Sequence, residues 1–288
     1  MTAGAPAVKS TRNAQDVRSA RGGPSARSRP SPAGSARNRF GRAIARGANV
    51  PRSADAPRRG EDELRALAAS GAAELGDDAP AEEVVAWAAR VFPDTLAVAC
   101  SMADAVLPHV VAARIPGVDT LFLQTGFHFA QTEETRDAVA ETMDITLIDV
   151  LPALTVAEQD ERFGPRLYAR DPGECCRLRK VEPLARALAG YEAWATGVRR
   201  EDAVTRTTTP LVGFDQTHRI VKINPLAAWT FDELLAYAAE HGVVVNPLLA
   251  DGYPSIGCEP CTRRVPPGED PRSGRWAGFA KTECGIHL

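Results

Sequence analysis

Two hydrophobic periodicities alternate along most of the chain. Apolar side chains recur every three to four residues in some stretches, which predicts amphipathic helices, and short apolar runs between them predict buried strands. The predicted helices lie within residues 61–91 (two helices), 104–114, 133–143 and 230–240. The predicted strands lie at residues 95–99, 120–123, 145–150, 193–196 and 219–223. Strands that alternate with helices favour right-handed crossovers, so we predict an α/β fold with a mainly parallel sheet.

Three predicted loops follow strands of this sheet. They span residues 101–104, 125–129 and 197–202. Ligands of open α/β sheets bind at the carboxyl ends of the strands, near the point where the strand order reverses. We therefore expect the functional site at these loops.

Charge divides the chain into two physically different parts. The first 60 residues hold thirteen Lys and Arg against Asp16 and Asp55, so they carry +11 while the whole chain of 288 residues carries −3. They contain few aliphatic side chains and cannot bury enough surface to offset the entropy of ordering. We predict a disordered basic extension at 1–60, an α/β domain at 61–270 and a C-terminal tail at 271–288. The extension is expected to be inert, although a targeting peptide or a nucleic-acid-binding arm fits the same composition.

Composition also bounds the location of the protein. The chain is 44% apolar, but no apolar run approaches the roughly 18 residues of a membrane helix. No apolar segment of a secretory signal precedes the domain. We expect a soluble protein in the reducing cytoplasm, where cysteines remain free to bind metal or do chemistry.

The cysteines form two pairs and two single residues. Cys175 and Cys176 open a predicted helix beside three cationic residues, and Cys258 and Cys261 form a C-x-x-C turn. Four soft ligands in two pairs suit zinc or an iron–sulfur cluster, and spacing alone leaves both open beside a vicinal disulfide. Cys100 is predicted to be a buried strand residue, whereas Cys284, near the C-terminus, is free to act as a nucleophile.

The surrounding motifs resemble those of a known family. The motifs are Cys-Cys-Arg-Leu-Arg-Lys-Val-Glu-Pro-Leu from Cys175, Trp-Ala-Thr-Gly-Val-Arg-Arg from Trp194, Gly-Tyr-Pro-Ser-Ile-Gly-Cys-Glu-Pro-Cys-Thr-Arg from Gly252, Arg-Ser-Gly-Arg-Trp from Arg272 and Lys-Thr-Glu-Cys-Gly-Ile-His-Leu from Lys281. From about residue 61 to the end, the chain resembles the assimilatory adenylylsulfate (APS) reductases of the iron–sulfur type. The resemblance implies a Rossmann-like nucleotide alpha-hydrolase fold with a mobile C-terminal tail.

The resemblance also implies an activity. It implies thioredoxin-dependent reduction of adenylyl sulfate to sulfite and AMP, through an S-sulfocysteine on Cys284, within sulfate assimilation and cysteine biosynthesis. A [4Fe-4S] cluster is implied at Cys175, Cys176, Cys258 and Cys261. The implied substrate-binding residues are Ser101, Asp104, Gly126, Lys180, Gly197, Arg199, Arg200, Arg272, Arg275 and His287.

Two positions depart from the family pattern. The loop after the first strand reads Ser101-Met102-Ala103-Asp104 where a small residue usually follows the serine. Gln124 stands where the family usually has an aspartate before Thr125-Gly126. Because glutamine still forms hydrogen bonds, we expect activity to survive this change.

Alternative functions differ in what they leave unexplained. 3'-Phosphoadenylylsulfate (PAPS) reductases share the terminal Glu-Cys-Gly motif but lack the two cysteine pairs. ATP-using sulfurtransferases of the superfamily need a Ser-Gly-Gly-x-Asp-Ser loop that this chain lacks. A zinc-stapled nucleic-acid-binding protein would use the basic arm but leaves Cys284 without a role. We expect no membrane or nucleic-acid partner, and leave a homo-oligomer open.

Overall fold

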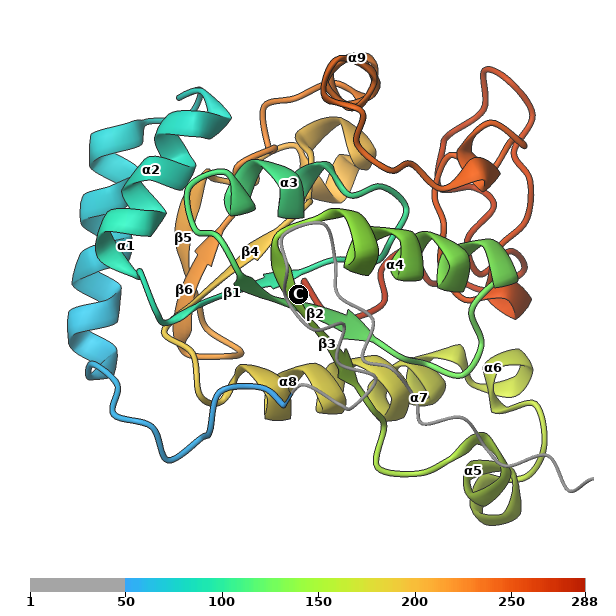
Figure 1. Ribbon diagram of the computed structural model, residues 1–288. Helices are drawn as coiled ribbons and strands as arrows, with labels where there is room; N and C mark the ends of the chain where they lie inside the picture. The colour runs from blue at the N-terminus through green and yellow to red at the C-terminus, as the bar shows by residue number, and fades with distance from the viewer. Residues whose placement is uncertain (1–49, 288) are drawn as a thin grey trace, which may run out of the picture. The chain divides into compact units, whose positions relative to one another are not determined.

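A computed structural model describes residues 50–287 of the chain. They contain a six-stranded sheet in the order β3-β2-β1-β4-β6-β5, in which β5 alone runs antiparallel to its neighbour (Figure 1). The strands are β1 (Leu96–Ala99), β2 (Val118–Leu123), β3 (Ile145–Val150), β4 (Ala193–Thr196), β5 (Val212–Asp215) and β6 (Ile220–Ile223). The predicted α/β fold with a mainly parallel sheet is confirmed.

Helices cover the sheet on both faces. The helices are α1 (Glu61–Leu75), α2 (Ala81–Val91), α3 (Val106–Ala112), α4 (Ala130–Thr142), α5 (Val156–Phe163), α6 (Leu167–Arg170), α7 (Pro172–Cys176), α8 (Glu182–Leu188) and α9 (Phe231–His241). Figure 1 shows α3 and α4 on one side of the central strands and α8 on the other, while α1 contacts β5 and β6. No helix within residues 50–287 is long and apolar enough to cross a membrane.

The sequence explains why these elements form where they do. β1 and β4 pair on both sides and are covered on both faces, so their residues form apolar runs rather than alternating ones. Thr155 and Thr230 begin α5 and α9 with capping boxes, in which each threonine accepts a hydrogen bond from the backbone N–H three residues on. Thr230 therefore caps the helix that periodicity predicts at residues 230–240.

The strand order reverses between β1 and β4. From β1 the chain builds β2 and β3 outward on one side, and it then returns through α8 to place β4 on the other side of β1. In a doubly wound sheet this arrangement opens a crevice at the carboxyl ends of the two adjacent strands. Residues 100–105 and 197–202 leave the sheet at this point.

The segment just before α1 is attached to the domain. Arg59 donates hydrogen bonds to both carboxylate oxygens of Glu192 through its backbone N–H and its guanidinium (2.6–2.9 Å), and the Arg52 N–H donates to Tyr191 Oη (3.0 Å). Of the predicted disordered extension 1–60, residues 1–49 lie outside the described residues. Residues 50–60 lie within the described part, where Arg59 is held by the buried carboxylate of Glu192.

Candidate active site

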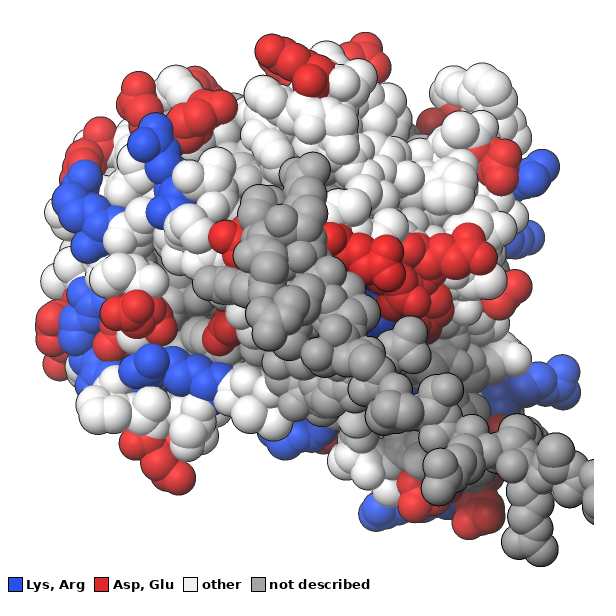
Figure 2. All heavy atoms as spheres, in the orientation of Figure 1, with Lys and Arg blue, Asp and Glu red and all other residues white. Residues whose placement is uncertain are grey.

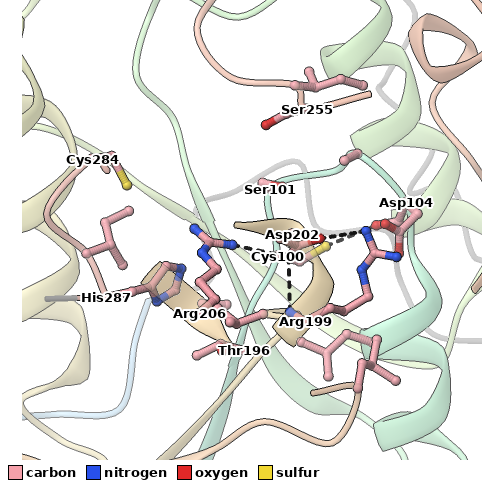
Figure 3. Close-up of a pocket in the computed structure, with 18 of the residues that line it drawn as sticks. Cys100, Ser101, Asp104, Thr196, Arg199, Asp202, Arg206, Ser255, Cys284 and His287 are labelled. Carbon is pink, nitrogen blue, oxygen red and sulfur yellow. Dashed lines mark hydrogen bonds and ion pairs between the residues drawn. The ribbon is translucent and has the colours of Figure 1, made fainter. Parts of the chain in front are cut away.

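A cavity of about 390 Å³ opens where β1 and β4 diverge (Figure 3). Its wall includes the end of β1 with the loop after it, the loop after β4 and the last residues of the chain. Residues 282–287 are called the tail from here on. Of the predicted substrate residues, it brings together Ser101, Asp104, Gly197, Arg199, Arg272, Arg275 and His287, with the predicted nucleophile Cys284. The site expected at the strand ends thus coincides with a cavity.

The loop after β1 contributes polar and thiol groups to the cavity. Ser101 is exposed in the wall, and Asp104 accepts a hydrogen bond from the N–H of Val106 (3.0 Å) at the start of α3. Burial raises the pKa of Asp104. Met102 between them is fully buried and has a left-handed backbone (φ 60°), so it packs inward while its neighbours face the cavity.

Cys100 both packs in the core and lines the cavity. Its thiol donates to the carbonyl of Asp104 (3.3 Å). Burial, followed by the nearby Asp104, raises the pKa of Cys100 to about 12. The thiol therefore stays protonated and unreactive at neutral pH, which agrees with its predicted packing role.

The loop after β4 separates two adjacent arginines. Arg199 lies in the cavity wall, where Asp202 holds it (2.6 Å) and its Nη1 donates no hydrogen bond. Arg200 points elsewhere: its guanidinium donates to the carbonyls of Thr209 (2.9 Å) and Asp77 (2.5 Å) and pairs with Asp78 (2.8 Å). The structure does not bring Arg200 to the cavity, because its side chain is occupied in joining this loop to the segment after α1.

Two further arginines enter the cavity from the segment after the C-x-x-C turn. Arg275 donates to Ser255 Oγ (3.1 Å) and the Ile256 carbonyl (3.2 Å), and its buried Nε has no partner. A Cβ at Gly257 would lie 2.2 Å from the Arg275 guanidinium, so glycine is needed there. Arg272 contacts Ser255 and the tail. With Arg199 they form a cationic wall suited to an anionic ligand.

The C-terminal tail closes one side of the cavity. Figure 3 shows Cys284 and His287 on this tail, with Arg206 between it and Asp202. The His287 ring stacks on Trp194 (centroids 5.7 Å apart, interplanar angle 14°), and its buried Nδ1 has no hydrogen-bond partner. Burial and the nearby Lys222 and Arg206 lower the pKa of His287 well below 6.5. The imidazole is therefore neutral at pH 7.

The two cysteine pairs meet beside this cavity. Cys175 and Cys176 end α7, Cys258 precedes a 3-10 turn (Glu259–Cys261) that ends at Cys261, and all four thiols are free. Burial and the other three thiols raise the pKa of Cys175 to about 12, which shows that the pairs are close. Among residues 50–287, however, no three His, Cys, Asp or Glu side chains gather around one ion position.

The chemistry of these four residues bears on which metal group fits. Four thiolates in two pairs can hold a single tetrahedral zinc ion, with Zn–S distances of about 2.3 Å. The same all-sulfur donor set is also the one that holds a [4Fe-4S] cluster. The four residues present fit an iron–sulfur cluster.

Lys180 lies between the cysteine pairs and the tail. Burial opposes its charge, but the thiols of Cys258, Cys284 and Cys176 outweigh burial and raise the pKa of Lys180 to about 12. Lys180 is not part of the cavity wall. Its ammonium group is within electrostatic range of both the predicted nucleophile Cys284 and two predicted cluster ligands, Cys176 and Cys258.

Comparisons with known proteins identify the family. A model of the phosphoadenosine phosphosulfate reductase domain matches residues 95–264. The adenosine 5'-phosphosulfate reductase of Mycolicibacterium smegmatis is 57% identical over 228 residues, which are 79% of this chain and 96% of that protein.

The chain belongs to the phosphoadenosine phosphosulfate reductase family.

Further family members agree with this assignment. The adenosine 5'-phosphosulfate reductase of Streptomyces coelicolor is 54% identical over 226 residues (78% of this chain, 95% of that protein). The crystal structure of phosphoadenylyl-sulfate (PAPS) reductase from Candida auris, a phosphate complex, matches with a TM-score of 0.56 and 28% identity, covering 73% of this chain and all of that one. The predicted family and fold are confirmed.

The loop after β2 explains how this member of the family accommodates Gln124. The side-chain oxygen of Gln124 accepts a hydrogen bond from the Gly126 N–H (3.2 Å), a role that an aspartate could fill. The side-chain NH₂ group of Gln124 donates to the carboxylate of Glu133 (2.9 and 3.1 Å). Gly126 has φ +75°, and a Cβ there would lie 3.0 Å from Val156 and 3.2 Å from Arg179. Gly126 therefore lies against Val156 and Arg179, outside the cavity wall, and shapes the loop.

The same loop contacts the second cysteine pair. Thr125 Oγ1 lies 3.4 Å from Cys258 Sγ, and the Thr125 carbonyl accepts from the buried Arg179, which also donates to Leu154 and Gln159. Burial alone would raise the pKa of Cys258, but Lys180 and Thr125 hold it below its usual value. The loop therefore helps to stabilise one predicted cluster ligand as a thiolate.

Several residues of the site were missed by the sequence analysis. Asp202 and Arg206 belong to no quoted motif, and Ser255 and Glu283 lie inside motifs whose neighbours drew attention instead. Arg206 lies in a short 3-10 turn (Val204–Arg206) and contacts Glu283, which is 77 residues away in the sequence. Only the tertiary structure brings these residues together.

Proposed function

We propose that this protein is an adenylyl-sulfate reductase that forms sulfite and AMP, with a thioredoxin-type dithiol protein as reductant. Family membership and the relatives named adenosine 5'-phosphosulfate reductase support the substrate. The observation that carries the proposal is the tail thiol of Cys284 in the wall of a cavity lined by arginines at the switch point of the sheet. The cell would use the sulfite in sulfate assimilation and cysteine biosynthesis.

The first step is attack by the tail thiolate. Cys284 Sγ attacks the sulfur of the sulfuryl group, the bond from that sulfur to the phosphate oxygen breaks, and AMP leaves with the electron pair. Arg199, Arg272 and Arg275 offset the repulsion between a thiolate and a doubly anionic group. Ser101, Asp104 and Gly197 form the polar part of the wall beside them, and the neutral His287 has an unpartnered ring nitrogen.

The second step regenerates the thiol. A thiolate of the reductant attacks Cys284 Sγ, and sulfite leaves with the electron pair of the S–S bond. The second thiol of the reductant then displaces Cys284 as a thiolate. The dithiol becomes a disulfide and loses two electrons, which balances the change from the sulfate to the sulfite oxidation state. Both electrons come from the dithiol.

We further propose that Cys175, Cys176, Cys258 and Cys261 hold a [4Fe-4S] cluster. The all-sulfur donor set and the cationic Lys180 beside it support this cofactor. When bound, the cluster would join the two segments and contribute an electrostatic field near the tail thiol. Anaerobic purification should give about four irons per chain. A colourless protein with one zinc would contradict the cofactor.

The cysteines also support a reducing compartment. All six cysteines are free thiols in the part of the chain that the structure describes. Thiols that must bind metal or act as nucleophiles persist in the cytoplasm, where disulfides are rare. We therefore propose a cytoplasmic location.

A single-turnover experiment tests the chemistry. The anaerobic protein is mixed with adenylyl sulfate and no reductant, and the tail peptide is analysed by mass spectrometry. We expect one AMP per active chain and a sulfonate adduct on Cys284. Cys284→Ser should give neither, whereas the matched thiol variant Cys100→Ala should retain the adduct. Normal AMP release by Cys284→Ser would refute the nucleophile.

A further inference from the structure

The residue just before the tail thiol is a buried acid. Glu283 is 9% exposed, and its carboxylate accepts from Arg206 Nε (2.9 Å) and Nη2 (2.8 Å) and from Arg272 Nη2 (3.1 Å). Thr205 Oγ1 donates to the same group (3.3 Å). Two guanidiniums thus converge on one carboxylate of the tail, directly beside Cys284.

These arginines are anchored independently of the tail. Arg206 also pairs with Asp202 (3.2 Å), which in turn pairs with Arg199 (2.6 Å) in the cavity wall. Arg272 donates to Ser255 Oγ (3.4 Å), and it reaches the tail backbone at the Thr282 carbonyl (2.8 Å). The contact therefore joins the tail to two separate walls of the cavity.

The contacts on either side of Cys284 differ in kind. On the C-terminal side, His287 stacks on Trp194 and Ile286 packs against the core. On the N-terminal side, the tail is held by charge-assisted hydrogen bonds, which are directional and about twice as strong as neutral ones. Removing one partner of a buried ion pair leaves the other charge buried without compensation, which is costly. The hydrogen bonds between Glu283 and the two arginines are therefore expected to form and break together.

We propose that Glu283 is a positioning residue that latches the tail over the cavity. Its carboxylate, held by Arg206 and Arg272, sets where Cys284 lies. Opening of this contact frees the tail. The part that the latch plays in turnover rests on the proposed function: closed, it presents the thiolate to substrate, and open, it exposes the sulfonated cysteine to the reductant. The latch itself is a property of the tail and can be measured without substrate.

The first test measures exposure of the tail thiol. Wild-type holoprotein, Glu283→Gln and the control Glu269→Gln are treated with N-ethylmaleimide, and the rate of Cys284 alkylation is followed in the tail peptide. Glu269 is an exposed acid of the preceding loop. Loss of charge-assisted bonds should raise the Glu283→Gln rate about tenfold or more, with Glu269→Gln at the wild-type rate.

A double-mutant cycle tests whether Glu283 acts through Arg206. If Glu283 acts through Arg206, adding Arg206→Gln to Glu283→Gln should raise the alkylation rate little beyond the single variants. Fully additive effects, or a Glu283→Gln rate equal to wild type, would overturn the latch. Unchanged cluster absorbance and circular dichroism show that the variants are folded.

The second test separates the two chemical steps. In single turnover with saturating adenylyl sulfate, Glu283→Gln should release AMP about tenfold more slowly than wild type, while discharge of the adduct by thioredoxin should not be slowed. Unchanged AMP release would contradict the positioning role. If the wild type releases no AMP although alkylation of Glu283→Gln is accelerated, the proposed function fails and the latch stands.

Discussion

Two thiols line one cavity in different surroundings. Cys100 lies at the end of a buried strand beside Asp104, and its pKa of about 12, set by burial and that carboxylate, keeps it protonated. Cys284 lies on the tail, near the cationic groups of Lys180, Arg206 and Arg272. Burial and hydrogen bonding therefore fit Cys100 to packing, whereas Cys284, which lines the cavity from the tail, is the proposed nucleophile.

His287 makes docking of the tail sensitive to pH. Burial, with Lys222, Arg206, Arg272 and His218 around the ring, lowers the pKa of His287 in the docked tail well below the ordinary 6.5. A free tail binds the proton more readily, so docking is fully favourable above about pH 6.5 and weakens as pH falls below it. The pKa of Glu283 is lowered by Arg206 and Arg272 against the effect of burial, so this acid loses its charge only at more acidic pH.

The prediction is measured by hydrogen exchange of the tail amides between pH 7.5 and 5.5. After correction for the intrinsic exchange rate, protection of residues 283–287 should decrease toward pH 5.5 in the wild type. His287→Gln should show a flatter profile, because its side chain does not titrate. Equal pH dependence in both proteins would contradict this role. His241, an exposed histidine at the end of α9, is the control as His241→Gln.

Sequence motifs identified which residues belong to the site, but not the direction in which each side chain points. Cys284, Arg272 and Arg275 stand in distinctive motifs, and all three line the cavity. Arg199 and Arg200 are equivalent in the sequence, yet only Arg199 faces the cavity, because Asp77, Asp78 and Thr209 hold the other. Those partners are distant in sequence, so no local pattern could distinguish the two arginines.

The loop between β2 and α4 holds the second departure from the family pattern. Gln124 uses both ends of its amide, accepting from the Gly126 N–H and donating to Glu133 on α4. We predict that Gln124→Glu lowers the free energy of unfolding by about 1–2 kcal/mol, because a hydrogen bond to a carboxylate is replaced by like-charge repulsion.

Chemical denaturation of the holoprotein measures this change. The double variant Gln124→Glu, Glu133→Gln restores a carboxylate–amide pair with the roles exchanged, and it should recover most of the lost stability. If the single variant is as stable as the wild type, the Gln124–Glu133 contact does not stabilise the loop. An aspartate, which the family usually has at this position, carries no amide N–H to donate, so sequence comparison alone did not reveal this pairing.

At the scale of the whole molecule, most strands and helices followed from periodicity, but the helices α5 and α6 and the strand β5 were missed. β5 (Val212–Asp215) was missed because it is a short antiparallel edge strand with the sequence Val-Gly-Phe-Asp, which lacks the apolar run of a central strand. The segment just before α1 makes contacts that its composition does not suggest. Residues 50–60 look like the basic extension in composition, but Arg59 pairs with the buried Glu192, and Gly190 leaves room for the Arg52 backbone.

This attachment predicts different effects for two truncations. A protein that begins at residue 61 loses Arg59 and leaves Glu192 buried without its partner, which should cost about 2 kcal/mol and lower Tm by about 4–8 °C. A protein that begins at residue 50 retains the pair and should melt within about 2 °C of the full chain. Calorimetry of the two holoproteins checks this. Equal Tm values for both would contradict the proposed attachment.

The most direct test of the central claim compares adenylyl sulfate with its 3'-phosphorylated form as substrates of the anaerobic holoprotein, with thioredoxin as reductant. Formation of sulfite is measured for each over a range of substrate concentrations. The account predicts sulfite and AMP in equal amounts from adenylyl sulfate, and a much lower kcat/KM for the 3'-phosphorylated substrate. Preference for the 3'-phosphorylated substrate, or no sulfite from either, would contradict it.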